Sequence, residues 1–517
     1  MNNLSGWFVH RSAKLLLYCL GVLFVLILYG SSPAFAADNG HIKGGWYPWK
    51  PYQYLEKVSG LRQLTGLDVE LFREVFEEEL GLTLELPQIA WDRHQKNIQE
   101  GTTDVAAGAF KTAERMNYAY FSEPYRKEDI VIISSRKELA ARRLLDPKVF
   151  LRDFQNSGFK AGVVAGYSYG NDVDEMMRKP QSLNRFVATG SDLENLINLK
   201  EGRVDLVLID RLVGGTLISD NNLSTSLVIG RKPLFSGDIR AMFSRKTTTP
   251  ALVDKFNLAM QKIKDDGRFN GIVRGYLFPT VLGITVGEPW FLALENIGTA
   301  AFAFSGILLA NQDRFSLFGA FVLASLPAVG GGILRDLIVS RDRLGFMESS
   351  HNLIIVIALV LVSYFVMHMP GHSRFTKITN FFKMKGPILV QLLDALGLAA
   401  FTVVGVIVAV GERCEPLLLW GPIFSALTGA GGAILRDVIR ADATHPTLKN
   451  VLYAEISLFW GFVLSLFVII YAELNTTDPY PLGVAVFTTA LGCFLTRLVV
   501  IAKKIKAPSF WRLRRSA

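Results

Sequence analysis

Hydrophobic residues are unevenly distributed along this chain of 517 residues, and their pattern divides it into two halves. Residues 40–280 mix charged and apolar positions as a globular domain does, whereas residues 290–503 consist mainly of long apolar runs. A helix needs ~20 apolar residues to cross the hydrocarbon core of a bilayer, and most of these runs reach that length, the third being short. The pattern predicts membrane spans at 291–310, 316–339, 352–368, 387–410, 416–439, 451–471 and 482–502.

The first 36 residues have the pattern of a secretory signal peptide. Arg11 and Lys14 precede an apolar core that runs from Leu15 to Tyr29, and Ala34-Phe35-Ala36 fits a small-x-small cleavage site. An uncleaved membrane anchor is the alternative, because the apolar core is long. In either case residues 37–280 are expected to be exported.

Basic residues are distributed asymmetrically around the predicted spans. If residues 37–280 are exported, the loops on the opposite side and the C-terminal tail contain 13 lysines and arginines, against three in the other loops. Such residues concentrate on the cytoplasmic side of membrane proteins. We therefore expect a multi-pass protein of the bacterial inner membrane, with its N-terminal domain in the periplasm and its tail, 503–517, in the cytoplasm. Much of the net charge of +9 lies in that tail, and no nucleic-acid partner is expected.

The membrane half contains an internal repeat. Gly330-Gly331-Gly332-Ile333-Leu334-Arg335-Asp336 recurs 101 residues later as Gly431-Gly432-Ala433-Ile434-Leu435-Arg436-Asp437. Upstream, Gly298-Thr299-Ala300-Ala301-Phe302 recurs as Gly397-Leu398-Ala399-Ala400-Phe401, and the acid Glu295 matches Asp394. The sequence predicts two three-span repeats and a separate last span, with boundaries at 290–386, 387–471 and 482–502.

A repeat of three spans, an odd number, makes the two copies inverted relative to one another in the membrane. Arg335 is then expected toward the outer face and Arg436 toward the inner face. A glycine run has a helix propensity about 1 kcal/mol per residue poorer than alanine, so these sites can bend or unwind and line a pathway beside the charged Arg-Asp pairs. The alternative is that the glycines only permit close helix packing and that the charged pairs are interface anchors.

The repeated motif GG[GA]xxRD resembles the bacterial relatives of the trimeric intracellular cation (TRIC) channels, whose domain is also described as a bacterial glycine transporter. The resemblance implies one pore per protomer between the second and fifth spans, assembly as a homotrimer among membrane lipids, and movement of either cations or small amino acids. The pore residues that it indicates are Gly330, Gly331, Gly332, Arg335, Asp336, Gly431, Gly432, Arg436 and Asp437.

The exported half contains a second ordered set of motifs. Gly66-Leu67-Asp68-Val69-Glu70-Leu71 precedes an amphipathic helix, Thr112-Ala113-Glu114-Arg115 and Phe121-Ser122-Glu123-Pro124-Tyr125 follow, and the strand 204–210 ends a second block. These motifs resemble the family 3 periplasmic solute-binding proteins, which implies two α/β lobes that bind a polar amino acid between them. The chain is thus predicted to be a two-lobed α/β binding domain followed by an all-α domain of seven spans.

The same resemblance indicates the residues that bind the ligand. Arg115 matches the arginine that binds the ligand carboxylate, and a guanidinium suits this contact because it can donate two parallel hydrogen bonds. Asp210 matches the acid that binds the ammonium, Ser168 a hydroxyl of the second lobe, and Trp46 an aromatic platform. Phe110 occupies a stretch where the family usually has serine or threonine, so we expect a ligand that is small or apolar, or a pocket that no longer binds amino acids.

No feature of the sequence predicts an enzyme. The P-loop pattern GxxxxGK[ST] does not occur in it, and its seven histidines include no close metal-type pair, so neither a cofactor nor a metal is expected. Three functions stay open: a binding domain that delivers a small amino acid to a transport domain, a ligand-gated monovalent cation channel, and a solute sensor or assembly module. The connection from Tyr276 to Trp290 is expected to act as a short tether that raises the ligand concentration at the pore mouth.

Overall fold

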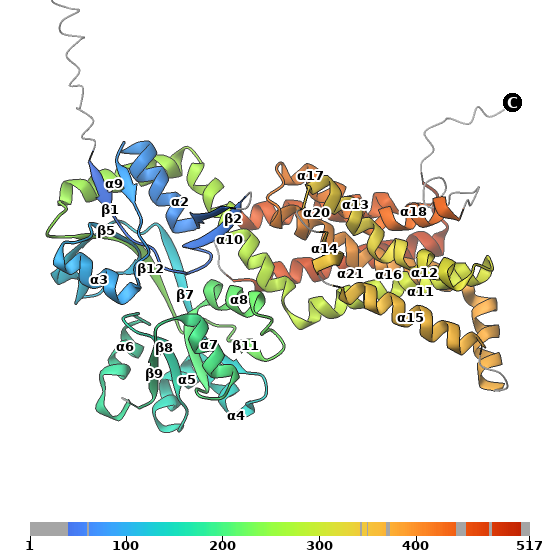
Figure 1. The fold of residues 1–517 in the computed structure, drawn as a ribbon, viewed down its shortest axis with the longest axis horizontal. Helices are drawn as coiled ribbons and strands as arrows, with labels where there is room; N and C mark the ends of the chain where they lie inside the picture. Colours follow the sequence, from blue (N-terminus) through green and yellow to red (C-terminus); the bar gives the residue numbers. More distant parts are fainter. Residues whose placement is uncertain are drawn as a thin grey trace, which may run out of the picture.

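The computed structural model shows a two-lobed binding domain beside a bundle of long helices, with helix α10 (Arg268–Val286) between them (Figure 1). It describes residues 40–58, 61–182, 184–341, 344–348, 350–368, 373–440, 451–474 and 478–507. The predicted signal peptide and most of the basic tail lie outside these ranges. The predicted order of an α/β domain followed by an all-α domain is confirmed.

Two long strands join the lobes of the binding domain. Strands β7 (Arg126–Ser135) and β12 (Phe235–Ser244) pair antiparallel from Ile130 opposite Phe235 to Arg126 opposite Ile239, and each continues into the sheet of one lobe. The first lobe adds β5 (Val105–Phe110) to β12, and the second adds β10 (Leu206–Asp210) to β7. Beyond β10 come β8 (Ala161–Val164) and β9 (Phe186–Thr189), both in parallel pairs.

The second lobe follows directly from its sequence. Strands β8 and β10 are buried along their whole length, as parallel strands covered on both faces are. Helix α7 (Asp192–Lys200) begins at Ser191, whose hydroxyl accepts a hydrogen bond from the amide of Glu194. Helix α8 (Arg211–Asp220) begins where β10 ends, with Asp210 as its N-cap. This strand-to-helix turn fixes the position of the Asp210 carboxylate at the edge of the sheet.

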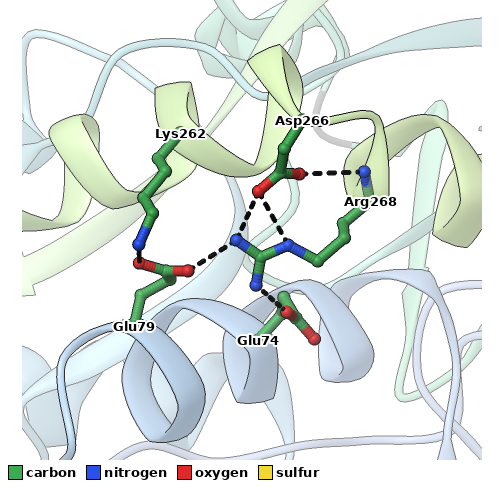
Figure 2. A network of polar contacts seen from close by, with 5 residues as sticks. All are labelled: Glu74, Glu79, Lys262, Asp266 and Arg268. Atoms are coloured by element: carbon green, nitrogen blue, oxygen red, sulfur yellow. Dashed lines mark hydrogen bonds and ion pairs between the residues drawn. The ribbon is translucent and has the colours of Figure 1, made fainter.

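Helix α10 is anchored to the first lobe by a network of charged side chains (Figure 2). Arg268, at the start of α10, bonds to Glu74 and Glu79 of η1 (Glu74–Glu79) and to Asp266. Lys262 of α9 (Pro250–Asp265) forms a second ion pair with Glu79, with an N–O distance of 2.6 Å. The network is exposed, so screening by salt weakens it, but it joins η1 to the turn between α9 and α10.

The expected short tether is helical for most of its length, because residues 276–286 continue α10. The helix packs against α2 (Leu67–Arg73) and α8 in the binding domain and against four membrane helices. These four are α11 (Pro289–Gln312), α16 (Ser373–Gly411), α20 (Ala454–Glu473) and α21 (Tyr480–Lys503). Ion pairs add to this joint: Arg274 lies 3.7 Å from Glu415, and Arg413 lies 3.9 Å from Glu56. The binding domain is therefore docked on one end of the bundle.

Within the described residues, seven helical segments are long and apolar enough to cross a membrane, which confirms the predicted number and agrees closely with the predicted positions. Two of them are interrupted by a π-helical segment just before the glycine motif, at η6 (Leu326–Gly330) and η7 (Leu427–Gly431). The seven segments are Pro289–Gln312 (α11), Leu317–Val339 (α12, η6 and α13), His351–His368 (α15), Gly386–Gly411 (within α16), Leu417–Ile439 (α17, η7 and α18), Ala454–Glu473 (α20) and Tyr480–Lys503 (α21).

Repeat-related residues contact one another at the centre of the bundle. The rings of Phe302 in α11 and Phe401 in α16 stack with centroids 5.6 Å apart and planes 3° apart. Gly331, the first residue of α13, lies against the backbone of η7, and Gly432, the first residue of α18, lies against that of η6. The two repeats thus pack face to face about a local two-fold relation, as inverted repeats do.

Candidate functional site

The cleft between the lobes contains a buried arginine without a carboxylate partner. Arg115, at the start of η2 (Arg115–Asn117), is only 6% exposed. Its guanidinium donates to the Gln95 side chain at 3.0 Å, to the Phe110 carbonyl at 2.9 Å and to the Gly166 carbonyl, in the second lobe, at 3.2 Å. No carboxylate of the described residues lies within ion-pair distance of it. Because burial disfavours the charged form, it lowers the pKa of Arg115.

The same carbonyl of Gly166 accepts two more hydrogen bonds from the first lobe. The indole nitrogen of Trp91 donates to it at 3.3 Å, and the side-chain amide of Gln95 at 3.1 Å. Three donors from the first lobe therefore converge on one acceptor of the second. The lobes contact one another here, and the conformation is closed at this edge of the cleft.

Asp210 presents one engaged and one unengaged carboxylate oxygen. Oδ1 accepts hydrogen bonds from the amides of Leu212 at 3.0 Å and Val213 at 2.9 Å, and from the Tyr52 hydroxyl at 3.3 Å. Oδ2 is buried and has no hydrogen-bond partner among the described residues. Burial raises the pKa of Asp210 to about 6, against the two amide hydrogen bonds that lower it. An unpaired buried acceptor of this kind is costly unless a donor arrives.

Further acids lie around Asp210, and the motifs had not indicated them. Arg126 holds both oxygens of Asp68, at 2.8 and 3.0 Å, and lies 3.3 Å from Glu128. Burial, followed by the charge of Asp210, raises the pKa of Glu128. Burial also raises the pKa of Asp192, at the start of α7, to about 7. Carboxyls outnumber guanidiniums in this part of the cleft, which favours a positively charged group.

The aromatic side chains between the lobes come from the segment that includes Trp46, but from its later residues. Trp46 itself is buried, with its amide donating to the Pro87 carbonyl at 3.0 Å. Tyr47 and Trp49 instead contact Tyr167 of the second lobe, with ring centroids 6.4 and 6.3 Å apart. The Trp49 ring lies so close to Gly108 that a Cβ atom there would be 2.8 Å from it. Tyr47 and Trp49 are thus aromatic candidates beside Trp46.

Ser168 and Phe110 lie on either side of Arg115. Ser168 belongs, with Arg115, to the lining of a cleft of about 770 Å³. Its hydroxyl donates to the side chain of Asp174, in α6 (Asn171–Arg178), at 2.5 Å. The Phe110 ring packs edge-to-face against Phe235, 5.3 Å away, while its carbonyl accepts from Arg115. The cleft therefore brings Arg115 and Ser168 together, and Asp210 lies in the acidic part deeper between the lobes.

The membrane domain contains a cavity of about 580 Å³ at the end that faces the binding domain. Gly332, Arg335 and Asp336 line it. The Arg335 guanidinium donates to one oxygen of Asp336, at 2.9 and 2.7 Å. Glu295, the repeat counterpart of Asp394, also lines the cavity and accepts a hydrogen bond from the Asn352 side chain at 3.2 Å.

A second cavity, of about 470 Å³, lies at the opposite end and contains the other copy of the motif. Arg436 holds both oxygens of Asp394 at 3.1 Å, and it also contacts Asp437 at 3.3 Å and the Ser305 hydroxyl at 3.0 Å. Basic side chains outnumber acids in its lining. Those basic residues are Arg436, Arg440, Arg497, Lys504 and Lys506.

The glycines separate into two groups by their surroundings. Gly331 and Gly432 sit where the two helices cross: a Cβ on Gly331 would lie 2.5 Å from the Leu427 carbonyl oxygen, and one on Gly432 would overlap the backbone of Leu326. Gly330 and Gly431 contact the same crossing, 3.7 Å from the partner glycine. All keep helical dihedrals, so the chain does not unwind here. This contact fits the packing hypothesis, whereas Gly332 faces the cavity with only Arg335 within 4 Å.

Comparisons with known proteins divide the chain at the same place. Residues 43–279 match the model of the bacterial extracellular solute-binding proteins, family 3, and residues 292–369 and 391–468 match that of the glycine transporters. The UPF0126 inner membrane protein YadS of Escherichia coli K12 is 30% identical over 217 residues, covering 42% of this chain and 94% of that protein.

Relatives of the binding domain are more distant. The L-cystine-binding protein TcyA of Bacillus subtilis 168 is 21% identical over 226 residues, 43% of this chain and 76% of that protein. Among solved structures, a histidine kinase sensor domain similar to periplasmic binding proteins is 21% identical, with a TM-score of 0.39, covering 45% of this chain and 93% of that one.

Proposed function

Because this chain belongs to the UPF0126, or glycine-transporter, family through its membrane half and to the family 3 solute-binding proteins through residues 43–279, we propose that it captures an amino acid and carries it across the membrane within one polypeptide. It is a multi-pass inner membrane protein, and its combination of domains is that of membrane transport. We propose in addition that the substrate is an amino acid, and we propose a direction of transport and a role for each membrane cavity.

The ligand of the cleft is an amino acid whose carboxylate binds Arg115 and whose ammonium binds Asp210. The observation that carries this is the pair of incomplete groups: a buried guanidinium without a carboxylate, and a buried carboxylate oxygen without a donor. A zwitterion supplies both missing partners. The similarity to L-cystine-binding proteins supports the same class of ligand.

The route runs through the two membrane cavities, which lie at opposite ends of the bundle and contain the two Arg-Asp pairs. Arg335 and Arg436 would receive the carboxylate in turn. The excess of basic residues around Arg436 supports an amino acid over a monovalent cation, because a positive lining repels cations and attracts carboxylates. The binding domain is docked at the Arg335 end, which makes that cavity the entrance.

The entrance faces the periplasm in this proposal. An odd number of spans puts the binding domain and the residues after α21 on opposite sides, and the distribution of basic residues selects the orientation. Three chains would assemble, each with its own route, as the family resemblance implies.

The decisive experiment measures binding and transport by the full-length protein. We expect calorimetry in detergent to give a dissociation constant for one of a panel of amino acids, and Arg115→Ala to lose about 2–5 kcal/mol of binding, because a desolvated charge loses its partner. Arg152→Ala, at an exposed arginine paired with its neighbour Asp153, is the matched control and should bind normally. Equal affinity of the Arg115 variant and the parent would remove Arg115 from the site.

Reconstituted vesicles then distinguish transport from conduction. The proposal expects uptake of the labelled amino acid that binds, and loss of uptake at low ligand concentration in Arg115→Ala. A potassium current that rises with ligand, without amino-acid uptake, would establish a ligand-gated channel instead.

A further inference from the structure

A third cavity lies where the binding domain meets the membrane boundary, away from the cleft and from both Arg-Asp motifs. It has a volume of about 410 Å³, and lobe two of the binding domain, the junction of α10 with α11 and the start of α21 all line it. The volume is in the range of pockets that bind small molecules. From this cavity we infer that the protein binds a phospholipid of the adjacent leaflet, with its phosphate held by lobe two and its acyl chains against α11 and α21.

The position of the cavity is that of the lipid headgroups. Trp290 is the second residue of α11 and Tyr480 the first of α21, so both spans begin at its wall. Tryptophan and tyrosine concentrate at this level of a bilayer, with their rings between hydrocarbon and water. Farther along α21, Val484 and Phe487 continue the wall as exposed apolar side chains, in the direction of the hydrocarbon core.

The wall formed by lobe two is cationic and has bonding capacity left. Arg231 stacks its guanidinium 3.6 Å above the Tyr480 ring, and none of the described carboxylates lies within 4 Å of it. Arg211 is 4% exposed; its two terminal nitrogens donate to the carbonyls of Gly230 and Arg231, and its Nε, 3.7 Å from Asp129, has no hydrogen-bond partner among the described residues. Arg231, whose guanidinium faces no described carboxylate, is the group that favours a phosphate, and Arg211 adds positive charge behind it.

The two acids of the lining have partners of their own. Glu288 lies 3.7 Å from Arg136, and a side-chain oxygen of Asp478 accepts the amide hydrogen of Tyr480 at 3.1 Å. A free phosphate would bind only to the wall formed by lobe two and would leave Trp290 and Phe487 exposed. A lipid can contact both walls at once, with its phosphate at lobe two and its acyl chains against α11 and α21. A lipid is therefore the proposed occupant.

Such a lipid would bridge the two domains. Its phosphate would contact lobe two, which carries Arg231 just after β11 (Leu227–Ile229), while its chains would contact the first and last spans. Lobe two is joined to lobe one through strands β7 and β12, and hinge closure around a ligand is a common motion of two-lobed binding domains. Lipid occupancy would therefore set how lobe two sits on the membrane domain.

The test uses delipidated full-length protein, titrated in detergent with dioleoyl phosphatidylglycerol and observed by native mass spectrometry. We expect one lipid per chain to be retained preferentially, and Arg231→Glu to weaken that retention about tenfold because it reverses the charge that meets the phosphate. Lys232→Glu makes the same charge change at the next residue, which lies outside the cavity lining, and should change retention less than twofold. An equal effect of both variants would mean general surface attraction and overturn the proposal.

A second variant tests the apolar wall. Gly483 faces the cavity, with the side chains of Thr285 and Trp290 no closer than 3.7 Å to an added Cβ, so Gly483→Leu should fill the space and abolish the preferential lipid while the chain folds. Glycerol 3-phosphate at millimolar concentration should not displace the lipid. Displacement by glycerol 3-phosphate, or undiminished retention in Gly483→Leu, would contradict a lipid as the occupant.

Discussion

The binding domain and the membrane domain both bury charged side chains, but they neutralise them differently. In the cleft, Arg115 donates to a side-chain amide and two backbone carbonyls, and one buried oxygen of Asp210 has no donor among the described residues. In the membrane, Arg436 holds Asp394 with two hydrogen bonds and also contacts Asp437. The charges of the cleft thus have unused bonding capacity, whereas Arg436 in the membrane domain is paired with carboxylates of the same chain.

A smaller version of this difference separates the two membrane repeats. Arg436 pairs with two carboxylates, whereas among the described residues Arg335 pairs with one, Asp336, which Arg341 also approaches at 3.8 Å. Glu295, the counterpart of Asp394, bonds to Asn352 instead. The arginines of the two motif copies therefore differ in the number of carboxylates with which they pair. The copy with fewer, that of Arg335, is the one beside the binding domain.

The largest expected effect is on folding, at the more engaged arginine. Arg436→Gln leaves two buried carboxylates without their cation, so we expect the free energy of unfolding to fall by about 3–5 kcal/mol. Arg335→Gln leaves one buried carboxylate, with Arg341 still near, and should cost clearly less. Thermal unfolding of the full-length variants in detergent measures both. A larger loss from Arg335→Gln would reverse the comparison between the repeats.

The glycines give the next effect. Gly331→Ala puts a methyl group against the Leu427 carbonyl, and such overpacking costs about 1–3 kcal/mol. Gly332→Ala meets only Arg335, 3.7 Å away, and reproduces Ala433 of the other repeat, so stability should hold or rise slightly. Unfolding and amino-acid uptake are measured together on both variants.

The role of each glycine follows from the pattern of those results. Loss of stability confined to Gly331→Ala indicates a packing contact at the crossing. Loss of uptake in a stable Gly332→Ala indicates that the cavity surface is part of the route. If Gly331→Ala were as stable as the parent, the close crossing would be refuted.

The smallest effect is on ligand affinity and concerns the Asp210 carboxylate of the cleft. Below the pKa of this group, the affinity should change about tenfold per pH unit. Because the pKa of Asp210 is raised from 3.8 to about 6, its carboxylate is lost below pH 6, and affinity for an ammonium ligand should fall as the pH is lowered from 7.5 to 5. Stability of the ligand-free protein should change in the opposite direction. The native state holds this proton more tightly than the unfolded chain does, so the free energy of unfolding falls as the pH rises from about 4 to about 6 and changes little above that.

Calorimetric titrations at pH 5, 6 and 7.5 check the affinity, with Asp210→Asn as the variant that cannot titrate. That variant should bind weakly at every pH, with a flatter profile than the parent. An identical pH dependence in parent and variant would assign the titration to another group, such as Asp192.

Much of the architecture was predictable, because it depends on patterns that the chain carries locally. Span length follows from the number of consecutive apolar residues, and all seven segments lie close to where the apolar runs predicted them. The order of motifs predicted two lobes followed by a bundle, and the odd number of spans per repeat predicted inversion. The motif positions also indicated Arg115 and Asp210, both of which lie between the lobes.

Other features depended on which residues meet across the fold, and no local pattern specifies that. Trp46, Tyr47 and Trp49 are equally aromatic in sequence, but only the packing of the lobes brings Tyr47 and Trp49 against Tyr167. Similarly, nothing in the sequence distinguishes Arg126 from other strand residues. Its pairing with Asp68 arises because strand β7 passes between the lobes.

The sequence alone determined the spans, the repeat, the two-domain order and the types of residue available for binding, since periodicity and motif order are properties of the chain. The tertiary structure decided which charges are paired. Arg335 and Arg436 occupy identical motifs, and their different partners arise because Glu295 and Asp394 lie among different neighbours once the helices pack. It also decided that glycines within one run serve different contacts: Gly331 faces a neighbouring backbone, and Gly332, one residue later, is rotated about 100° around the helix into the cavity.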